Sequence, residues 1–356
     1  MKIYQRYLAR EVSAAILLVL LAFLALFSFF DMLGEVKSFG QGGYEFRHAF
    51  GYVMLRLPGR AYELMPLAVL IGTLYALSAL SRHSEITVLR VSGLSTAALL
   101  FSLLQVATVF AVATFLIGEY VAPPAEQAAN QLRLKERGRT ARDLRSGLWV
   151  RDEMSFINVR FVLSAMSLRA IRIYQFDEQA RLQTVTEAAA GEYVEPDGWR
   201  LTEVVQTMLH DDRAEVEKLP EMFWRSALNP DILTVLMVAP DRMSLRHLSA
   251  YTRHLAENRQ KTSRYDIAFW KKIFYPLAGL VMVALALPFA GGQYRTAGVS
   301  LRIFAGIMIG VLFHTLNGLF ANLGAINSWS PLLSAATPPT LFLLAAATMI
   351  WWVERR

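Results

Sequence analysis

Apolar residues along this chain gather into six long runs, separated by short polar segments and by one long polar stretch. The runs are approximately Val12–Met32, Ala61–Leu80, Thr96–Val121, Ile273–Ala290, Ile303–Leu323 and Leu332–Val353. Each approaches the roughly 20 residues that a helix needs to cross the hydrocarbon core of a bilayer, where every backbone amide must be bonded within its own segment. The pattern therefore predicts six transmembrane helices.

The long polar stretch runs from about Pro123 to Tyr265 and has the charge content of an ordinary aqueous domain. Its middle contains short runs rich in β-branched and aromatic residues, and the turn sequence EPDG at Glu195–Gly198 separates two of them. Such runs predict antiparallel strands and hence a sandwich or jelly roll. Near its end, Ser244 is positioned to cap an amphipathic helix that leads to the fourth apolar run.

The predicted chain thus has three parts. Residues 1–122 hold transmembrane helices one to three, residues 123–265 form a jelly-roll-like β domain with a flanking helix, and residues 266–356 hold helices four to six. The fold class is an α-helical membrane protein with an all-β domain inserted between the third and fourth transmembrane helices.

Basic residues in the short loops and tails predict the orientation. The side that holds both termini has nine of them and the opposite side has four, namely Lys2, Arg6, Arg10, Arg82, Arg90, Arg295, Arg302, Arg355 and Arg356 against Lys37, Arg47, Arg56 and Arg60. Because short loops rich in Lys and Arg stay in the cytoplasm, we expect both termini there. The ends of the long β domain are also basic, but long domains translocate largely regardless of charge and are left out of the comparison.

Composition narrows the function classes. With 54% hydrophobic and 18% charged residues the chain is too apolar for an ordinary soluble enzyme, and without cysteine it has no disulfide, thiolate nucleophile or cysteine-bound metal. The net charge of +7 is scattered along the chain and forms no stripe, so nucleic acid is not an expected partner. The sequence contains no phosphate loop and no H-E-x-x-H motif, and we expect no catalytic residues, no metal site and no cofactor.

Polar groups inside the apolar runs are candidates for function because they are costly in hydrocarbon. Asp31, Glu63 and Glu119 all fall near the outer ends of their helices, where interfacial anchoring and a functional role are equally compatible with the sequence. In the fifth run, small or polar residues recur every three to four positions, at Gly306, Gly310, His314 and Asn317/Gly318. This stripe lets another helix approach closely, either as plain packing or as a sliding or gating contact.

The segment SRHSEITVLRVSG between the second and third runs is longer than a simple reversal needs. Ser84 is a reasonable N-cap, Glu85 in the first turn complements the helix dipole, and Gly93 is a good stop signal. We therefore predict a short helix over about 84–92, on which Ile86 and Leu89 could face a partner. An inert surface turn is the alternative.

The whole chain resembles the LptF/LptG permeases, which extract lipopolysaccharide from the inner membrane of Gram-negative bacteria. The resemblance rests on the order of the elements and on SEITVLRVSG, GEYVAPPAEQAAN (Gly118–Asn130), SGLWVRD (Ser146–Asp152), IRIYQFDEQARLQTV (Ile171–Val185) and FWKKIFYPLAGLVM (Phe269–Met282). The strand motifs and the KIFYPL sequence look more like the LptG branch of the family than the LptF branch.

The resemblance implies a set of partners and sites. The short helix would be the coupling helix of a dimeric cytosolic ABC ATPase, with Glu85 as the acidic coupling residue and with Ser84, Ile86, Leu89 and Arg90 beside it. A paralogous LptF permease and an LptC-type single-helix periplasmic protein would complete the transporter, and the β domain would lie in the periplasm. Lipid phosphates would meet Lys37, Arg133 and Arg137, with Arg60 and Arg264 as further candidates, and Gly306, Gly310, His314 and Asn317 would belong to a lateral gate. Asp31 stands where the family pattern leads one to expect a cation.

Two other functions fit parts of the sequence. One is a permease for lipoproteins or another amphiphile, and the other is a periplasmic binding or scaffold protein that its helices merely anchor.

Overall fold

The computed structural model describes residues 3–355, except 41–42, 138–146, 153, 165, 178, 180, 196–197, 211–212, 227, 229, 231–232, 234–238, 258–259 and 291–298. Six of its helical segments are long and apolar enough to cross a membrane: Ile3–Val36, Phe46–Arg82, Thr96–Arg133, Ser263–Ala286, Ser300–Ile326 and Pro331–Val353. Each predicted run falls on one of these segments, so the prediction of six spanning helices is confirmed, although several helices extend beyond the apolar runs.

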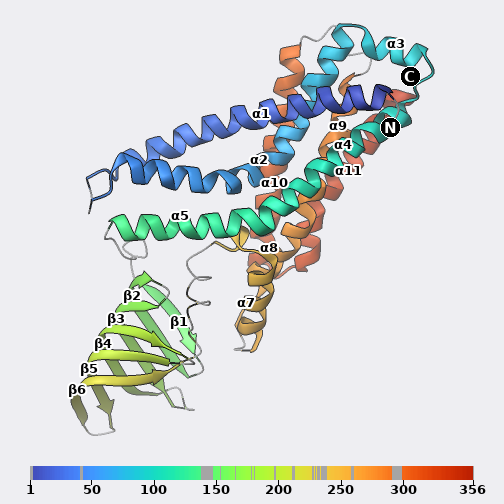
Figure 1. The fold of residues 1–356 in the computed structure, drawn as a ribbon. Coiled ribbons are helices and arrows are strands. Elements are labelled where there is room, and N and C mark those ends of the chain that lie inside the picture. Colours follow the sequence, from blue (N-terminus) through green and yellow to red (C-terminus); the bar gives the residue numbers. More distant parts are fainter. Residues whose placement is uncertain are drawn as a thin grey trace.

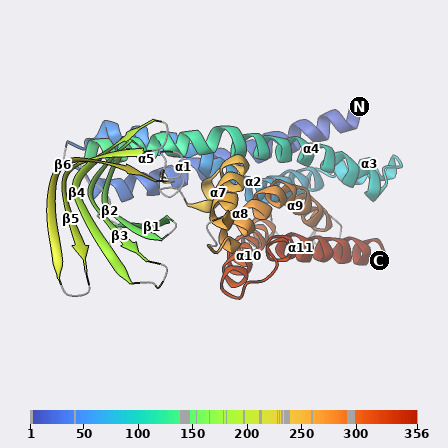
Figure 2. The same cartoon turned by 90° about the horizontal axis from the view of Figure 1, so that it is seen from below.

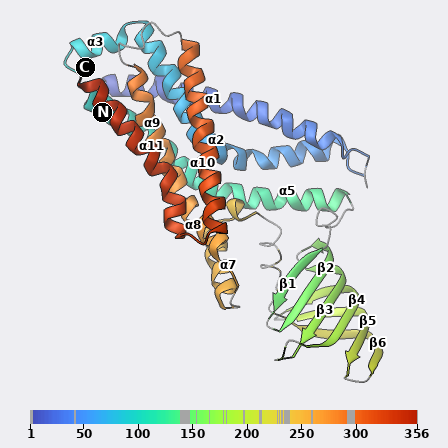
Figure 3. The ribbon, with the colours of Figure 1, turned by 180° about the vertical axis from the view of Figure 1, so that it is seen from behind.

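The N-terminal half contains helices α1 (Ile3–Val36), α2 (Phe46–Arg82), α3 (Glu85–Val91), α4 (Thr96–Leu116) and α5 (Ala122–Arg137), with the π-helical segment η1 (Ile117–Val121) between the last two. The C-terminal half contains η2 (Pro240–Arg242), α7 (Leu245–Glu257), α8 (Ser263–Phe274), η3 (Tyr275–Leu277), α9 (Ala278–Ala286), η4 (Leu287–Ala290), α10 (Val299–Ile326) and α11 (Pro331–Glu354). Helix α3 and both termini lie at one end of the molecule and the sheet lies at the other (Figures 1 and 3).

Helices α1 and α2 touch backbone to backbone at one point. A Cβ atom on Gly72 would lie 2.5 Å from Cα of Ile16, so only glycine permits this crossing. Around it, Leu8, Ile16 and Leu74 are fully buried in a cluster that draws side chains from nearly every spanning helix. Close contact at a glycine is a common way for membrane helices to pack, because van der Waals contact must replace the hydrophobic effect.

The third span does not end at its two prolines. The chain continues through η1 into α5, and the Ala122 N–H donates to Ile117 O, five residues back. Pro123 and Pro124 lie in the first turn of α5, where a missing N–H is tolerated. As a result α5 leaves the bundle beside α1 and α2 and packs Ala129 against Tyr52 and Val53 of α2 (Figure 1).

Six antiparallel strands follow, namely β1 (Leu148–Asp152), β2 (Ser155–Ser164), β3 (Ser167–Phe176), β4 (Leu182–Val194), β5 (Gly198–Leu209) and β6 (Ala214–Arg225). They pair in sequence order within one sheet, so these strands form a meander and show none of the Greek-key crossovers of a complete jelly roll. The prediction of an all-β domain between the third and fourth spans is confirmed. Its core centres on Trp199, which is fully buried and donates to Leu228 O at 2.7 Å.

A crease crosses the sheet. The pairing register skips Arg160, Ala170, Ala189 and Glu203, which occupy one transverse row on strands β2 to β5. Ala170 and Glu203 have left-handed φ angles of 51° and 52°, which side chains other than glycine rarely adopt. The register is the same on both sides of the row, so no residue is inserted there, and the sheet curves along its strands (Figure 2).

Helix α7 begins as the sequence predicts. The Ser244 Oγ accepts from the His247 N–H at 3.2 Å, and Leu248, Tyr251 and Leu255 are buried on one side of the helix. Gln260, which follows α7, donates to Arg151 O in β1 at 3.3 Å, so this region contacts the edge of the sheet.

Candidate functional site

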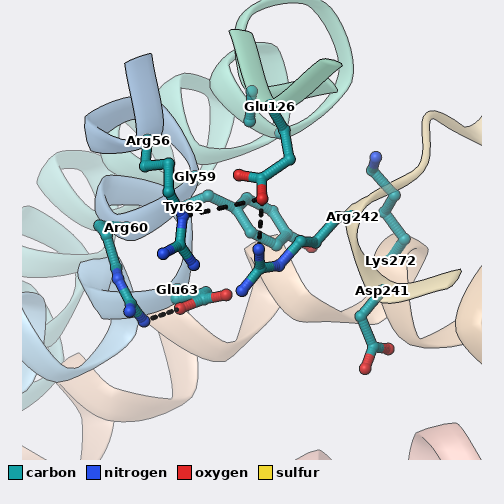
Figure 4. A pocket seen from close by; sticks show the side chains of 11 residues that line it. Arg56, Gly59, Arg60, Tyr62, Glu63, Glu126, Asp241, Arg242 and Lys272 are labelled. Atoms are coloured by element: carbon teal, nitrogen blue, oxygen red, sulfur yellow. Dashed lines mark hydrogen bonds and ion pairs between the residues drawn. The ribbon is translucent and has the colours of Figure 1, made fainter. Parts of the chain in front are cut away.

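A cluster of charged side chains fills the junction of α1, α2, η1, α5, η2 and α8. We call it the polar cluster; its members are Asp31, Arg56, Arg60, Glu63, Glu119, Glu126, Asp241, Arg242, Lys271 and Lys272. Most of its residues line a small pocket (Figure 4). Buried charges are rare in proteins unless they are paired, so a group of them makes this junction the candidate functional site.

Arg60 joins α1 to α2. Its Nη2 and Nε lie 2.8 and 3.1 Å from the two carboxylate oxygens of Asp31, which is a bidentate pair, and its Nη1 donates to Glu63 at 3.1 Å. The guanidinium also lies over the Phe27 ring, with its Cζ 5.7 Å from the ring centroid. Only 15% of the Asp31 side chain is exposed, so water screens this pair weakly.

Glu126 of α5 lies between two arginines. Arg56 of α2 approaches with its Nε 3.7 Å from Glu126 Oε1, and Arg242 of η2 donates to the same oxygen from the other side (Figure 4). Arg56 also lies 3.9 Å from Asp31. One acid thus connects α5 to α2 and to the segment that precedes α7.

Glu119 and Lys272 form the most deeply buried ion pair that the described part of the chain shows. Their charged atoms are 3.6 Å apart, and their side chains are only 7% and 6% exposed. Both oxygens of Glu119 also accept the N–H of Leu245, at 2.8 and 3.1 Å, while Lys272 donates to Met243 O. The π-helical segment that carries Glu119 therefore binds the start of α7 and the last turn of α8.

A second, larger cavity of about 380 Å³ opens beside the polar cluster. Lys271, Lys272 and Asp241 line one side of it, and His314 and Asn317 of α10 line another. The acids and bases of the cluster are largely matched, so its physical effect is to hold six elements together rather than to present a bare positive surface.

The predicted phosphate-binding residues do not form one group in the structure. Arg60 is already held by two carboxylates, and Arg133 lies 3.5 Å from Glu35 with its Cζ 5.2 Å from the centroid of the Tyr52 ring. Lys37 and Arg264 are exposed, at the end of α1 and the start of α8. Arg137 ends α5, and its side chain lies outside the described residues. Arg60 and Arg133 do bind the same side of α1, because their partners Asp31 and Glu35 lie one turn apart on that helix.

The predicted surface helix exists as α3, but two details differ. It spans Glu85–Val91, and Ser84 has a left-handed φ of 61° and makes no side-chain capping bond. Ile86 does not face a partner either, because it is 5% exposed and belongs to the core of the bundle. Leu89 is partly buried and Arg90 is exposed, while Val88 and Val91 are the open apolar residues, at 63% and 85% exposed.

The stop signal at Gly93 behaves as predicted. Its φ is 91°, its N–H donates to Arg90 O at 3.0 Å, and the next N–H, of Leu94, donates to Leu89 O at 3.0 Å. These two bonds define a Schellman motif, which ends the helix sharply. At the other end of α3, the Glu85 carboxylate accepts from the Tyr7 hydroxyl of α1 at 2.8 Å.

The glycine stripe of α10 faces α2 of the same chain. A Cβ on Gly306 would lie 2.4 Å from Leu74 Cδ1, and one on Gly310 would lie 2.0 Å from Leu67 Cδ1. Asn317 is buried, whereas His314 is exposed toward the larger cavity. The close approach that the stripe predicts is therefore present, with an internal partner.

Comparison with known proteins gives this arrangement a family. The family model described as lipopolysaccharide export system permease LptF/LptG matches residues 6–352. The chain belongs to the LptF/LptG family. It is 30% identical to the lipopolysaccharide export system permease protein LptG of Escherichia coli K12, over 99% of this chain and 98% of that protein. It is also 30% identical to LptG of Haemophilus influenzae, again over 99% and 98% of the two chains.

The similarity predicted from the sequence motifs is thus confirmed, including its leaning toward LptG. An LptF/LptG protein of this kind is a multi-pass membrane protein of permease type. Among the described residues no group of three or more His, Asp or Glu side chains is arranged to hold a metal ion.

Most of the polar cluster was missed in the sequence, although its spacing carries a signal. Arg56 and Arg60 lie four residues apart, and Glu119 and Glu126 lie seven apart, so each pair falls on one side of its helix. One pair is basic and the other is acidic, and both lie on segments near the same membrane surface. Together they indicate a network of ion pairs between helices. Arg242 and Lys272 had no comparable pattern around them.

Proposed function

We propose that this chain is the LptG-type permease subunit of a lipopolysaccharide exporter, which extracts the glycolipid from the inner membrane and passes it to periplasmic bridge proteins. The observation that carries the proposal is similarity to LptG over the full length of both proteins, at 30% identity. The chain has no nucleotide-binding loop, so a separate dimeric cytosolic ATPase supplies the work. An LptF permease and an LptC-type single-helix protein are the further partners.

Force enters through α3. Glu85 is the acidic coupling residue, and Arg90, Leu89 and the exposed Val88 and Val91 form the surface that meets the ATPase. A seven-residue helix with a sharp stop on one side and a buried Ile86 on the other is rigid enough to transmit a push.

The orientation follows from charge. The short segments on the side of α3 and both termini hold nine basic residues against four on the other side, which puts that side in the cytoplasm. The sheet, at the opposite end of the molecule, then lies in the periplasm (Figure 1).

Anionic cargo requires cations near the outer surface. Lys37, Arg133, Arg137 and Arg264 are the residues that we propose for lipid phosphates; Arg133 would first have to leave Glu35, and Arg60 would have to leave Asp31 and Glu63. Gly306 and Gly310 would let α10 shift along α2 when a lateral gate opens, and His314 and Asn317 would line the space beside it.

Two experiments test the function. The first purifies the chain from its native membrane: an ATPase and a second six-helix permease should co-purify with it, and their absence would contradict the proposal. The second expresses the chain together with its ATPase and LptF partner in cells depleted of their own LptG. Growth and lipopolysaccharide at the cell surface should be restored, whereas restored lipoprotein release alone would favour the lipoprotein permease.

A further inference from the structure

A side-chain hydrogen bond connects helix α3 to α1. The Tyr7 hydroxyl of α1 donates to Glu85 Oε2 at 2.8 Å, although Tyr7 is 78 positions away in the chain and 43% exposed. One residue further on each helix, Leu8 and Ile86 are both buried in the same hydrophobic cluster. The Tyr7–Glu85 hydrogen bond therefore links the two helices, next to a core to which each helix contributes the neighbouring residue.

Helix α1 is long and has no residue that would kink it between its two attached ends. From Tyr7 to Asp31 it contains no glycine or proline, so nothing in the sequence marks a kink. It crosses α2 in backbone contact at Ile16 and Gly72, which makes that crossing a natural pivot. At 1.5 Å per residue, about 14 Å separate Tyr7 from the pivot and about 22 Å separate the pivot from Asp31.

The far end of α1 is also attached. Asp31 binds Arg60 of α2 through two hydrogen bonds at 2.8 and 3.1 Å, and this pair belongs to the polar cluster. A displacement of α3 that moves Tyr7 by 1 Å would move Asp31 by about 1.6 Å, since the two arms of a rigid helix differ in that ratio.

We infer that Tyr7 is a positioning residue for energy coupling: its hydroxyl holds the Glu85 carboxylate and makes α1 the element that carries movement of α3 to the Asp31–Arg60 ion pair. The inference rests on the proposed function of α3 as the coupling helix. It assigns Glu85 two partners, the motor on one side and α1 on the other. A carboxylate with two acceptor oxygens can serve both at once.

The test uses Tyr7→Phe, which removes one hydroxyl and keeps the ring. The full complex with its ATPase and second permease is reconstituted in vesicles that contain lipopolysaccharide, and lipid release and ATP hydrolysis are measured together. We expect ATP hydrolysis to stay near the unsubstituted value and the lipid released per ATP to fall about fivefold, the factor that corresponds to losing one solvent-accessible hydrogen bond. Tyr4→Phe, on the same helix three residues earlier, is the matched control and should leave the ratio unchanged.

A double-mutant cycle separates this role from general stabilisation. If Tyr7 acts through Glu85, then Tyr7→Phe should have no further effect on the ratio in a Glu85→Ala background, which removes the acceptor. Independent, additive losses would overturn the inference, and so would equal losses of hydrolysis and release in Tyr7→Phe. If the unsubstituted complex releases lipid and the Tyr7→Phe complex releases the same amount per ATP, only this inference fails. If the unsubstituted complex releases no lipid, the proposed function fails as well.

Discussion

The Arg60 guanidinium holds both carboxylate oxygens of Asp31, at 2.8 and 3.1 Å, and so ties α2 to α1 where these helices leave the bundle. This pair gives Asp31 a structural role within the chain. Asp31 neutralises Arg60 within the chain, so the positive charge available to a cargo at this point depends on whether the pair is closed or open. The polar cluster is thus a structural joint, and under the proposed function its cations would reach a cargo only when their ion pairs open.

Removing Asp31 should weaken this joint. Asp31→Asn leaves Arg60 with only Glu63 and one weak acceptor, and we expect the detergent-solubilised protein to lose about 1–3 kcal/mol of unfolding free energy, the range for a hydrogen-bonded charge. Thermal unfolding measures the loss. The control is Glu45→Gln, which breaks an ion pair to Arg47 whose side chains are 64% and 75% exposed and should change little. Equal effects of the two substitutions would contradict the assigned role of Asp31.

The Glu119–Lys272 pair gives a sharper contrast with its neighbour. Lys272→Met leaves a carboxylate of 7% exposure without its cation, and we expect a loss of about 3–5 kcal/mol. Lys271→Met removes a cation whose partner Asp241 is 64% exposed, and should cost less than about 1 kcal/mol. Adding Glu119→Gln to Lys272→Met should recover part of the loss, because the neutral amide still accepts the Leu245 N–H. Chemical denaturation of the three variants checks the order.

The glycine stripe is tested on one helix with an internal control. Gly310→Ala puts a methyl group 2.0 Å from Leu67 Cδ1 and should cost about 1–3 kcal/mol, whereas Gly318→Ala meets nothing within 4 Å and should be tolerated. Leu67→Ala should rescue Gly310→Ala. If α10 must also slide along α2, then lipid release in the rescued double variant should still be impaired while its thermal stability is normal. Normal lipid release in that variant would show that the glycine stripe serves only the packing of α10 on α2.

The crease of the sheet predicts a substitution that stabilises. Ala170 has a left-handed φ of 51°, which costs a non-glycine residue roughly 1–2 kcal/mol, so Ala170→Gly should slow hydrogen exchange of the β3 and β4 amides. Ala189 lies in the same row without such an angle, and Ala189→Gly should instead speed exchange, since glycine weakens a strand. Faster exchange in both variants would mean that the crease stores no strain.

The sequence predicts the spanning helices because a run of about 20 apolar residues matches the length of helix that crosses the hydrocarbon core of a membrane. It predicts the end of α3 for a similar reason, since Gly93 tolerates the φ of 91° that a Schellman motif needs. The start of α3 was misjudged, because a serine before a helix is normally a cap and only the tertiary structure shows Ser84 in the left-handed region.

The beginning of the aqueous domain shows another limit of sequence reasoning. Two consecutive prolines after an apolar run usually mark a break, yet Pro123 and Pro124 fall in the first turn of α5 and the helix continues. The pairing of Glu126 with Arg56 and Arg242 was out of reach for a further reason. Those partners lie on elements 70 and 116 positions away, and local spacing gives no information about which helices pack together.

One measurement tests the central claim most directly: release of lipopolysaccharide from vesicles that contain this chain with its ATPase and second permease, with and without ATP. We expect release only with ATP, and we expect Glu85→Lys to abolish it while the complex remains inserted in the vesicle membrane. Release that proceeds without ATP, or that continues unchanged in Glu85→Lys, would show that no work passes through α3.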